Sequence, residues 1–321
     1  MFRRFMKLRT GPARATDLCL SLKGFEGKAD AMSSVDTTQD AGWRGTVAKA
    51  SLGLSIFAVL WFVIAAVGAR LGAWSWQFGL GTMTLNWGLK LIFLALGVSV
   101  IAMVLSLIKA PRKRAFILSL AALLVAGLSF GRVAAFGGQA TRLPPIHDVQ
   151  TDWSDPIQPS ERLVAERKAD GAMNPIEDAP VVPEAAEGRW PGTPGRLVSE
   201  LQEEAEFRPE EQDSPKVAPY PKLATYEAPV AQPDAFATIV ELVKDRGWKI
   251  VTADAAEGRI EATETSFWFG FKDDVMIRVL PMEAGGTRID VRSTSRVGLS
   301  DLGANAKRVR NLLDDIEVAL H

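Results

Sequence analysis

The sequence predicts a membrane anchor of three transmembrane helices followed by a small α+β domain, in which a four-stranded antiparallel sheet carries helices on one face. Two observations lead to this fold class. Three apolar runs, each 22 to 24 residues long, lie between residues 47 and 136. From residue 234 the pattern becomes helix, four alternating segments and helix, the order of a two-layer domain. A proline-rich segment separates the two parts.

The apolar runs cover residues 47–69, 85–108 and 115–136. A helix needs about 20 residues to cross the hydrocarbon core of a bilayer, so each run is long enough. Lys90 and Arg132 lie near the ends of their runs, where a long side chain can reach the interface. We therefore expect three membrane spans rather than core helices of a soluble protein.

Basic residues predict the orientation of these spans. The loop between the second and third runs, KAPRKR, is basic, and so is the segment before the first run. Trp74, Trp76 and Trp87 are placed as interfacial anchors at the opposite ends. Because basic loops remain in the cytoplasm, residues 1–46 are predicted to form a cytoplasmic, disordered tail. Everything after residue 137 is predicted to lie in the periplasm, outside the inner membrane.

The composition excludes several classes of function. A formal net charge of −1 gives no general attraction to nucleic acid, so no nucleic-acid partner is expected. Cys19 is the single cysteine, and His147 and His321 are the two histidines. A zinc site of Cys and His ligands cannot be assembled from these residues, and we expect no metal and no cofactor. The start of translation, Met1 or Met32, is left open.

A strap and linker are predicted over residues 137–233, because residues 144–233 contain 15 of the 18 prolines. Prolines at this density prevent long helices and central strands. The opening LPPIHDVQTDWSDP contains His147, Asp148 and Asp152, which allow a metal site. A turn or a strap that lies against the folded domain is the favoured interpretation.

The C-terminal domain is predicted over residues 234–321, with a helix that Gly247 ends. Four alternating segments follow, at 248–252, 259–264, 275–280 and 288–295, and then a final helix. Side chains of a strand alternate between the two faces of a sheet. The face toward the helices is predicted to contain Ile250, Ile260, Ala262, Val275, Ile277, Val279, Ile289 and Val291. The polar face is predicted to contain Lys249, Glu261, Thr263, Arg278, Asp290 and Arg292, with Arg278 opposite Asp290.

The stretch FWFGFKDDVMIRV, residues 267–279, combines aromatic residues with two adjacent aspartates. Asp273 and Asp274 should point to different faces of a strand, which disfavours a catalytic pair. Gly270 is a natural bend. The aromatic residues either close one end of the core or form a lip around an apolar groove for a lipid chain or a partner; they are Phe267, Trp268, Phe269 and Phe271.

These residues also resemble a known family. FWFGFKDDVMIRV, the later GGTRIDVRSTSRVGLSDLGANAKRVRNLL, and LPPIHDVQTD after the last apolar run are similar to membrane-anchored members of the bacterial domain-of-unknown-function family 1499, which is common in Gram-negative bacteria. The resemblance implies no established activity. It implies that the segment 296–303 belongs to a pattern shared by the family, together with the strand residues Asp274, Arg278, Asp290 and Arg292. From this pattern we take a candidate binding face of Asp274, Arg278, Asp290, Arg292, Arg296 and Asp301. The alternative is that these residues form only a solvated surface and bind nothing.

The function predicted from these features is that of an integral membrane protein of the cell envelope that presents a non-catalytic periplasmic binding or interaction domain on a tether. The expected partners are membrane lipids and a lipid-like ligand or an envelope protein. One alternative is a structural or regulatory subunit whose spans hold a membrane complex. A hydrolase that uses carboxylates and arginine is a weaker alternative, because the sequence has no GxSxG motif, no metal-ligand spacing and no phosphate loop.

Overall fold

Residues 42–140, 142–206 and 220–321 are described by a computed structural model. The chain divides into two compact units, one of Met1–Ser55 with Ala95–Leu124 and one of Ile56–Leu94 with Val125–His321. The predicted tail lies almost wholly outside the described residues, as do both possible translation starts.

Three long helices occupy the N-terminal half of the described chain. They are α2 (Trp43–Arg70), α3 (Leu89–Ile108), which continues the π-helical segment η1 (Gln77–Gly88), and α4 (Lys113–Ala140). The segments that are long and apolar enough to cross a membrane are Trp43–Arg70, Gln77–Ile108 and Lys113–Gly138. The three predicted spans are therefore confirmed in length and composition.

Small residues pack the helices in the first unit. The hydroxyls of Ser55 and Ser99 lie 3.2 Å apart, and each serine is buried. Ala48 packs against Ala115. Close helix contacts through small residues are typical of membrane helices, because dispersion rather than the hydrophobic effect must hold them together.

In the second unit, α2 and η1 form a tight hairpin. The Trp74 indole donates a hydrogen bond to Ala65 O at 3.0 Å. Its ring covers Gly68, where an added Cβ would lie 2.0 Å from the ring. Trp61 donates to Met83 O at 2.8 Å. Trp74 packs within the hairpin because the glycine leaves room for its ring. Its role as an anchor at the interface stays a prediction.

The C-terminal domain contains one sheet with six strands rather than the predicted four. Its order is β1-β6-β5-β4-β3, and β2 also pairs with β6; all pairs are antiparallel. The four long strands match the prediction and are β3 (Lys249–Asp254), β4 (Arg259–Thr265), β5 (Lys272–Pro281) and β6 (Thr287–Ser295). The two added strands are β1 (Asp148–Gln150) and β2 (Tyr226–Ala228). Three-residue strands are too short to produce a readable period.

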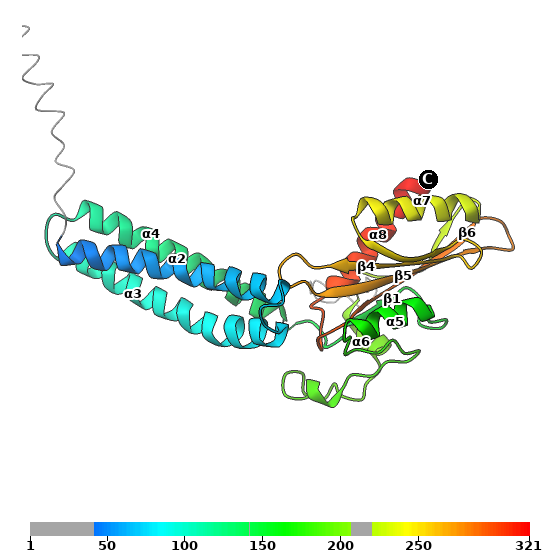
Figure 1. Ribbon diagram of the computed structural model, residues 1–321, viewed down its shortest axis with the longest axis horizontal. Helices are drawn as coiled ribbons and strands as arrows, with labels where there is room; N and C mark the ends of the chain where they lie inside the picture. Colours follow the sequence, from blue (N-terminus) through cyan, green and yellow to red (C-terminus); the bar gives the residue numbers. More distant parts are fainter. Residues whose placement is uncertain (1–41, 141, 207–219) are drawn as a thin grey trace, which may run out of the picture. The chain divides into compact units, whose positions relative to one another are not determined.

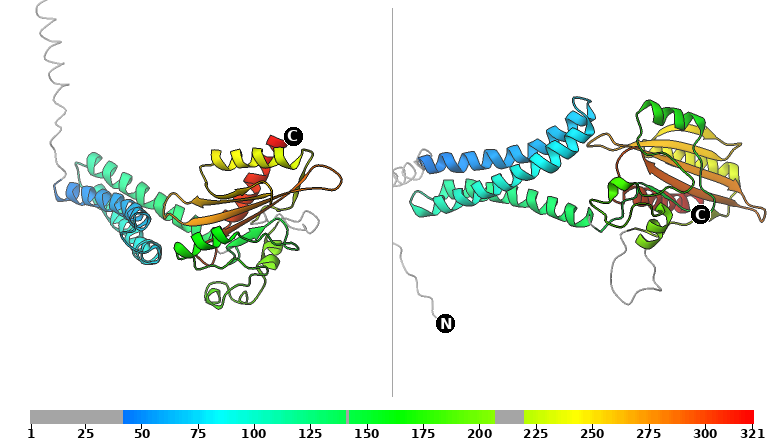
Figure 2. Two further views of the ribbon diagram at one scale, coloured as in Figure 1. Left: turned by 45° about the vertical axis from the view of Figure 1, so that its right-hand side comes forward. Right: turned by 90° about the horizontal axis from the view of Figure 1, so that it is seen from below.

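Helices cover both faces of this sheet, not one face as predicted. The helices α7 (Gln232–Asp245) and α8 (Ala304–Leu320) pack on one face, and α5 (Glu161–Ala169) lies on the other (Figures 1 and 2). The sequence concealed α5 because its exposed face is highly charged and few of its residues are apolar. Leu163 of α5 is fully buried and packs with Val251 and Met276 on the face predicted to be polar.

The predicted division of the two sheet faces is otherwise confirmed. The main buried cluster contains Ile260, Ala262, Val275, Ile277, Val279, Ile289 and Val291, with Ile250 packed against it. Every residue of this cluster lies between Leu143 and Leu320. The domain of residues 142–321 therefore has a hydrophobic core of its own.

The proline-rich segment is part of this domain over much of its length, which differs from the expected tether. In addition to β1, α5 and β2, it forms the short helices η2 (Glu184–Ala186) and α6 (Val198–Ala205). It contributes Ile146, Val149 and Leu201 to the core. Its prolines lie mainly between these short elements, where they cost no ladder or helix hydrogen bonds.

Candidate functional site

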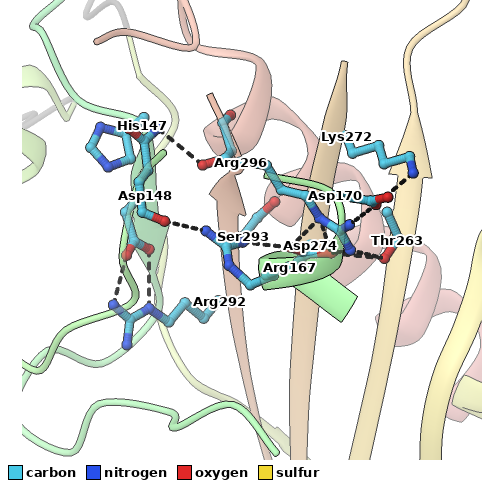
Figure 3. A network of polar contacts seen from close by, with 12 residues as sticks. His147, Asp148, Arg167, Asp170, Thr263, Lys272, Asp274, Arg292, Ser293 and Arg296 are labelled. Atoms are coloured by element: carbon cyan, nitrogen blue, oxygen red, sulfur yellow. Dashed lines mark hydrogen bonds and ion pairs between the residues drawn. The ribbon is translucent and has the colours of Figure 1, made fainter. Parts of the chain in front are cut away.

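The polar face of the sheet lies beneath residues 148–178, which we call the covering segment. Arg292 of β6 connects the two at the deepest point (Figure 3). It donates from Nε to Asp148 Oδ1 at 3.0 Å and from Nη2 to Asp148 Oδ2 at 2.6 Å, and both side chains are fully buried. It also donates to Ile157 O at 2.9 Å and Glu177 O at 2.7 Å. One guanidinium thus binds the covering segment at three places.

A second buried cluster is centred on Asp274 of β5. Its carboxylate accepts hydrogen bonds from Thr263 Oγ1 at 2.7 Å, Arg296 Nη2 at 2.7 Å and Arg296 Nε at 2.9 Å. Arg167 of α5 binds the same carboxylate and also donates to Asn174 O at 2.6 Å. Figure 3 shows Thr263 of β4, Arg296 just after β6 and Arg167 of α5 converging on the Asp274 carboxylate. Asp274 is fully buried, so its acceptor positions are used inside the protein.

The outer side of this cluster is closed by Asp170. It accepts from Lys272 Nζ at 2.5 Å and binds Arg296. Burial raises the pKa of Asp170, but Lys272 and Arg296 outweigh burial and hold it below its usual value. Burial lowers the pKa of Arg296, and its bonds to Asp274 reverse this and raise the pKa overall. Arg296 and both of its carboxylate partners therefore form a charged network.

The start of α5 is held by the sheet as well. Ser160 caps the helix by accepting from Leu163 N at 3.2 Å. Its own backbone N–H donates to Glu261 Oε1 at 2.6 Å, and its hydroxyl binds the second oxygen of that carboxylate. Glu261 is fully buried on β4. The two ends of α5 are thus tied to two carboxylates of the polar face.

The predicted pair Arg278 and Asp290 is confirmed. The two residues are register partners on β5 and β6, and Arg278 Nη2 lies 2.9 Å from Asp290 Oδ2. Asp290 also binds Arg288 at 3.0 Å and accepts from Thr225 at 2.5 Å. Arg278 reaches Asp155 of the covering segment at 2.9 Å. This pair lies nearer the solvent than the Arg292 pair.

Asp301 lies apart from the other five residues of the candidate binding face. It precedes α8 and accepts from Asn305 N at 2.7 Å and Gly303 N at 2.9 Å, with the Tyr220 hydroxyl at 3.3 Å. Burial raises the pKa of Asp301 to about 6. Its hydrogen bonds satisfy the free N–H groups at the start of the helix, which is a capping role.

Asp273 and Asp274 point to opposite faces, as their adjacency predicts. Asp273 binds Arg308 of α8 at 2.6 Å, whereas Asp274 faces the covering segment. The two carboxylates therefore serve different layers of the domain. Among the described residues no group of three or more His, Cys, Asp or Glu is arranged to hold a metal ion.

His147 is buried beside this network without joining it through its ring. Its Nδ1 has no hydrogen-bond partner within the described parts of the chain. Its backbone oxygen accepts from Ser295 N at 2.8 Å and Asn305 Nδ2 at 3.0 Å. Burial lowers the pKa of His147 below its usual value of 6.5. A neutral imidazole is therefore the favoured form in the folded domain.

The aromatic residues form a turn at the other end of the sheet, which we call the aromatic loop (residues 266–271). Gly270 has a φ of 70°, and Ser266 N donates to Phe271 O at 2.7 Å. Phe267 and Trp268 are exposed, at 75% and 53%, and meet edge to face. None of the aromatic residues belongs to a buried core cluster. The loop thus does not close the core.

The end of α2 lies against this loop, within the same compact unit. Arg70 Nη1 donates to Ser266 O at 2.6 Å and Phe267 O at 2.7 Å. Trp76 meets Phe271 edge to face, with the ring centres 5.7 Å apart. Trp268 and Phe269 line a cavity of about 370 Å³ whose other walls are helical. Whether the loop binds a ligand stays a prediction.

The comparison with known families agrees with this architecture. The family model described as "Protein of unknown function (DUF1499)" matches residues 148–316, just over half of the chain. The chain belongs to this family. The match begins at Asp148, the partner of Arg292, and its range includes the covering segment, so the family domain extends over this layer. No curated protein matches the chain.

The DUF1499 residues that the sequence did not reveal are those that approach from the covering segment. Arg167 and Asp170 bind Asp274 and Arg296 but gave no signal, since they lie on a charged helix over 100 residues earlier. Asp148 was noticed only as a possible metal ligand. Arg292 was the residue from which this layer could have been predicted, because a guanidinium on a central strand requires an acidic partner.

Proposed function

We propose that this DUF1499 protein is an integral membrane protein of the bacterial cell envelope that presents a non-catalytic lipid-binding domain on the periplasmic side of the inner membrane. The observation that carries the proposal is the pair of hydrogen bonds from Arg70 to the carbonyl oxygens of Ser266 and Phe267. Arg70 ends the first apolar helix. This contact supports a position of the aromatic loop at the end of the first proposed span.

The exposed residues of the loop suit this position. Tryptophan and other aromatic side chains are enriched at the membrane–water interface, where an apolar ring can be buried and a polar edge can remain hydrated. Of the described aromatic residues in the C-terminal domain, Phe267 and Trp268 are the two that are mostly exposed. Phe267 and Trp268 are adjacent and their rings are in contact, so they form one apolar patch, and such patches mark binding surfaces more often than single exposed residues do.

The charged residues support a non-catalytic role. Asp274, Asp148 and Glu261 are fully buried, and each is bound by basic or hydroxyl groups of the domain. General acid–base catalysis needs a group within reach of a substrate proton. Asp274 and Glu261 face the covering segment, and Asp148 belongs to it and binds Arg292, so all three contribute to the contact between the sheet and this segment.

Reporter fusions test the orientation. Alkaline phosphatase is active only outside the cytoplasm, so a fusion after His321 should be active. A fusion within the basic loop after Pro111 should be inactive, while a fluorescent protein that folds in the cytoplasm should give the reverse pattern. The matched pair controls for expression. An inactive phosphatase at His321 with an active one at Pro111 would refute the proposed orientation.

A further inference from the structure

The cavity beside the aromatic loop is built within one compact unit from three helices and the loop. Its volume is about 370 Å³, which lies in the range of ligand pockets. Most of its lining is apolar. The residues that matter here are Val63 and Ala66 of α2, Ile92 of α3, Val133 of α4, and Trp268 and Phe269 of the loop.

Three polar side chains also line the cavity, and two of them have partners. Ser129 donates to Val125 O at 2.7 Å, and Thr84 donates to Gly79 O at 2.9 Å. Arg132 is the third. It is exposed, and its guanidinium has no hydrogen bond or ion pair with any part of the chain that the structure describes. The cavity therefore combines a mostly apolar lining, which we call the apolar chamber, with one guanidinium, that of Arg132, which is unpaired within the described residues.

The position of Arg132 limits what can neutralise it. It lies six residues before Gly138, the end of the third apolar span, or about 9 Å along the helix. Charged side chains at such depths are costly unless they find a partner or reach the interface. A guanidinium binds phosphate with two parallel hydrogen bonds. Lipid phosphates lie at the interface, toward which the long side chain of an arginine near the end of a span can extend.

We propose that this cavity binds one phospholipid, with an acyl chain in the apolar chamber and the phosphate on Arg132. The inference rests on the proposed function in one respect, the position of the aromatic loop at the end of a membrane span. The occupant is a lipid rather than a soluble molecule because the helical walls belong to segments apolar enough to span a membrane. Trp268 and Phe269 line the cavity on the side of the C-terminal domain.

Lys90 provides a matched control for Arg132. It also lies on a span and is mostly exposed, but it does not line the cavity. If Arg132 only extends toward the interface, Arg132→Gln and Lys90→Gln should behave alike. If Arg132 binds the phosphate, only Arg132→Gln should release the lipid.

Native mass spectrometry of the full-length protein tests this proposal. The protein is reconstituted with phosphatidylglycerol or with diacylglycerol, which has the same chains without phosphate, and is then extracted in mild detergent. The wild-type protein should retain one phosphatidylglycerol and about tenfold less diacylglycerol. Arg132→Gln should lower phosphatidylglycerol retention about tenfold, and Lys90→Gln should leave it unchanged. Equal retention by Arg132→Gln and wild type, or equal loss in both variants, overturns the proposal.

A second pair of variants tests the chamber itself. Val133→Phe fills the cavity, whereas Leu128→Phe adds the same ring on an exposed position of α4 that does not line it. Only Val133→Phe should lose the lipid, with equal helix content by circular dichroism. Equal retention in both overturns the proposal. The reporter fusions distinguish failure of the proposed function from failure of the phospholipid inference. A reversed topology with Arg132-dependent lipid retention refutes the proposed function alone. The proposed topology without Arg132-dependent lipid retention refutes the phospholipid inference alone.

Discussion

The polar face of the sheet and the aromatic loop make opposite use of their side chains. The polar face concentrates charged residues, yet Asp274, Arg292 and Glu261 are fully buried and bound to other groups of the domain. The aromatic loop contains only a few large apolar residues, yet Phe267 and Trp268 are exposed. The difference teaches that a cluster of charges identifies a function only when some of them remain available.

The physical reason lies in the cost of desolvation. Removing an ion from water costs several kcal/mol, so a buried charge persists only when other groups of the protein satisfy it. The covering segment supplies those groups for Arg292 through Asp148, Ile157 O and Glu177 O. Exposed aromatic rings have the opposite balance, since they gain free energy when something apolar covers them.

The largest expected effect on stability tests the buried side of this comparison. Arg292→Ala leaves Asp148 buried without its cation and removes two hydrogen bonds to the covering segment. We expect the free energy of unfolding of the fragment 142–321 to fall by about 3–5 kcal/mol. Denaturant unfolding followed by circular dichroism measures it.

Arg278→Ala is the matched control for Arg292→Ala. It removes an arginine of the same face whose partner Asp290 keeps Arg288 and Thr225. The expected loss is about 1 kcal/mol. Equal losses for the two variants would contradict the view that burial beneath the covering segment decides the effect.

The second prediction concerns α5. Arg167→Ala removes one of the two guanidiniums on Asp274 and the bond to Asn174 O, while Arg296 and Thr263 remain. The expected loss is about 1.5–3 kcal/mol, the usual range for hydrogen bonds to charged groups. Lys168→Ala changes the next residue, which is exposed, and should stay within about 0.5 kcal/mol. A similar loss for Lys168→Ala would show that the positive charge in the last turn of α5, and not the Asp274 contact, determines the result.

The two regions also differ in how far the sequence predicted them. The long strands, their faces and the Arg278–Asp290 pair follow from alternation and local turns. The strap predicted to lie against the domain is confirmed at β1, which pairs with β6. The rest of the covering segment could not be predicted, because its contacts join residues more than 100 positions apart, as between Arg167 and Asp274. The bend predicted at Gly270 is confirmed, since this residue has a φ of 70° and β4 ends before it, at Thr265.

The contact between Arg70 and the loop had no sequence signal either. It joins residues 196 positions apart, and it involves backbone oxygens that any residue could supply. A pattern of side chains cannot reveal such a contact. The aromatic residues themselves were recognisable, because four of them in five positions are unusual for a surface turn.

A smaller effect is expected from pH, through His147. Burial lowers its pKa in the folded domain below 6.5, so the unfolded chain binds a proton more readily as the pH falls. Its contribution to stability is therefore complete above about pH 7 and is lost as the pH falls through 6.5 toward the folded pKa. His147→Gln should reduce the loss of stability between pH 7 and pH 5, measured by denaturant unfolding at both values.

The control for this titration is the other histidine. His321 is the exposed final residue, and His321→Gln should leave the acid dependence of the wild type unchanged. Asp301 acts in the opposite direction, because its raised pKa of about 6 makes the folded state bind protons more readily between about pH 4 and 6. Both variants retain Asp301, so its contribution cancels in the comparison. An unchanged slope for His147→Gln would assign the acid sensitivity to other groups.

The smallest effect on stability is expected at the aromatic loop, where it sharpens the comparison most. Phe267→Ala with Trp268→Ala removes two exposed rings that belong to no core cluster, so the free energy of unfolding should change by no more than about 0.5 kcal/mol. Binding of the fragment 142–321 to phospholipid vesicles, measured by co-sedimentation, should fall at least about tenfold, because each ring loses its burial in the interface. Val318→Ala removes an exposed apolar residue of α8 at 81% exposure and should leave vesicle binding unchanged. Stability and binding would then separate by region: the buried charges determine whether the domain stays folded, and the exposed rings determine what it touches. Equal vesicle binding by the loop variant and the Val318 variant would show that the aromatic loop does not contact the lipid. Any vesicle binding would then have to come from other residues of the domain.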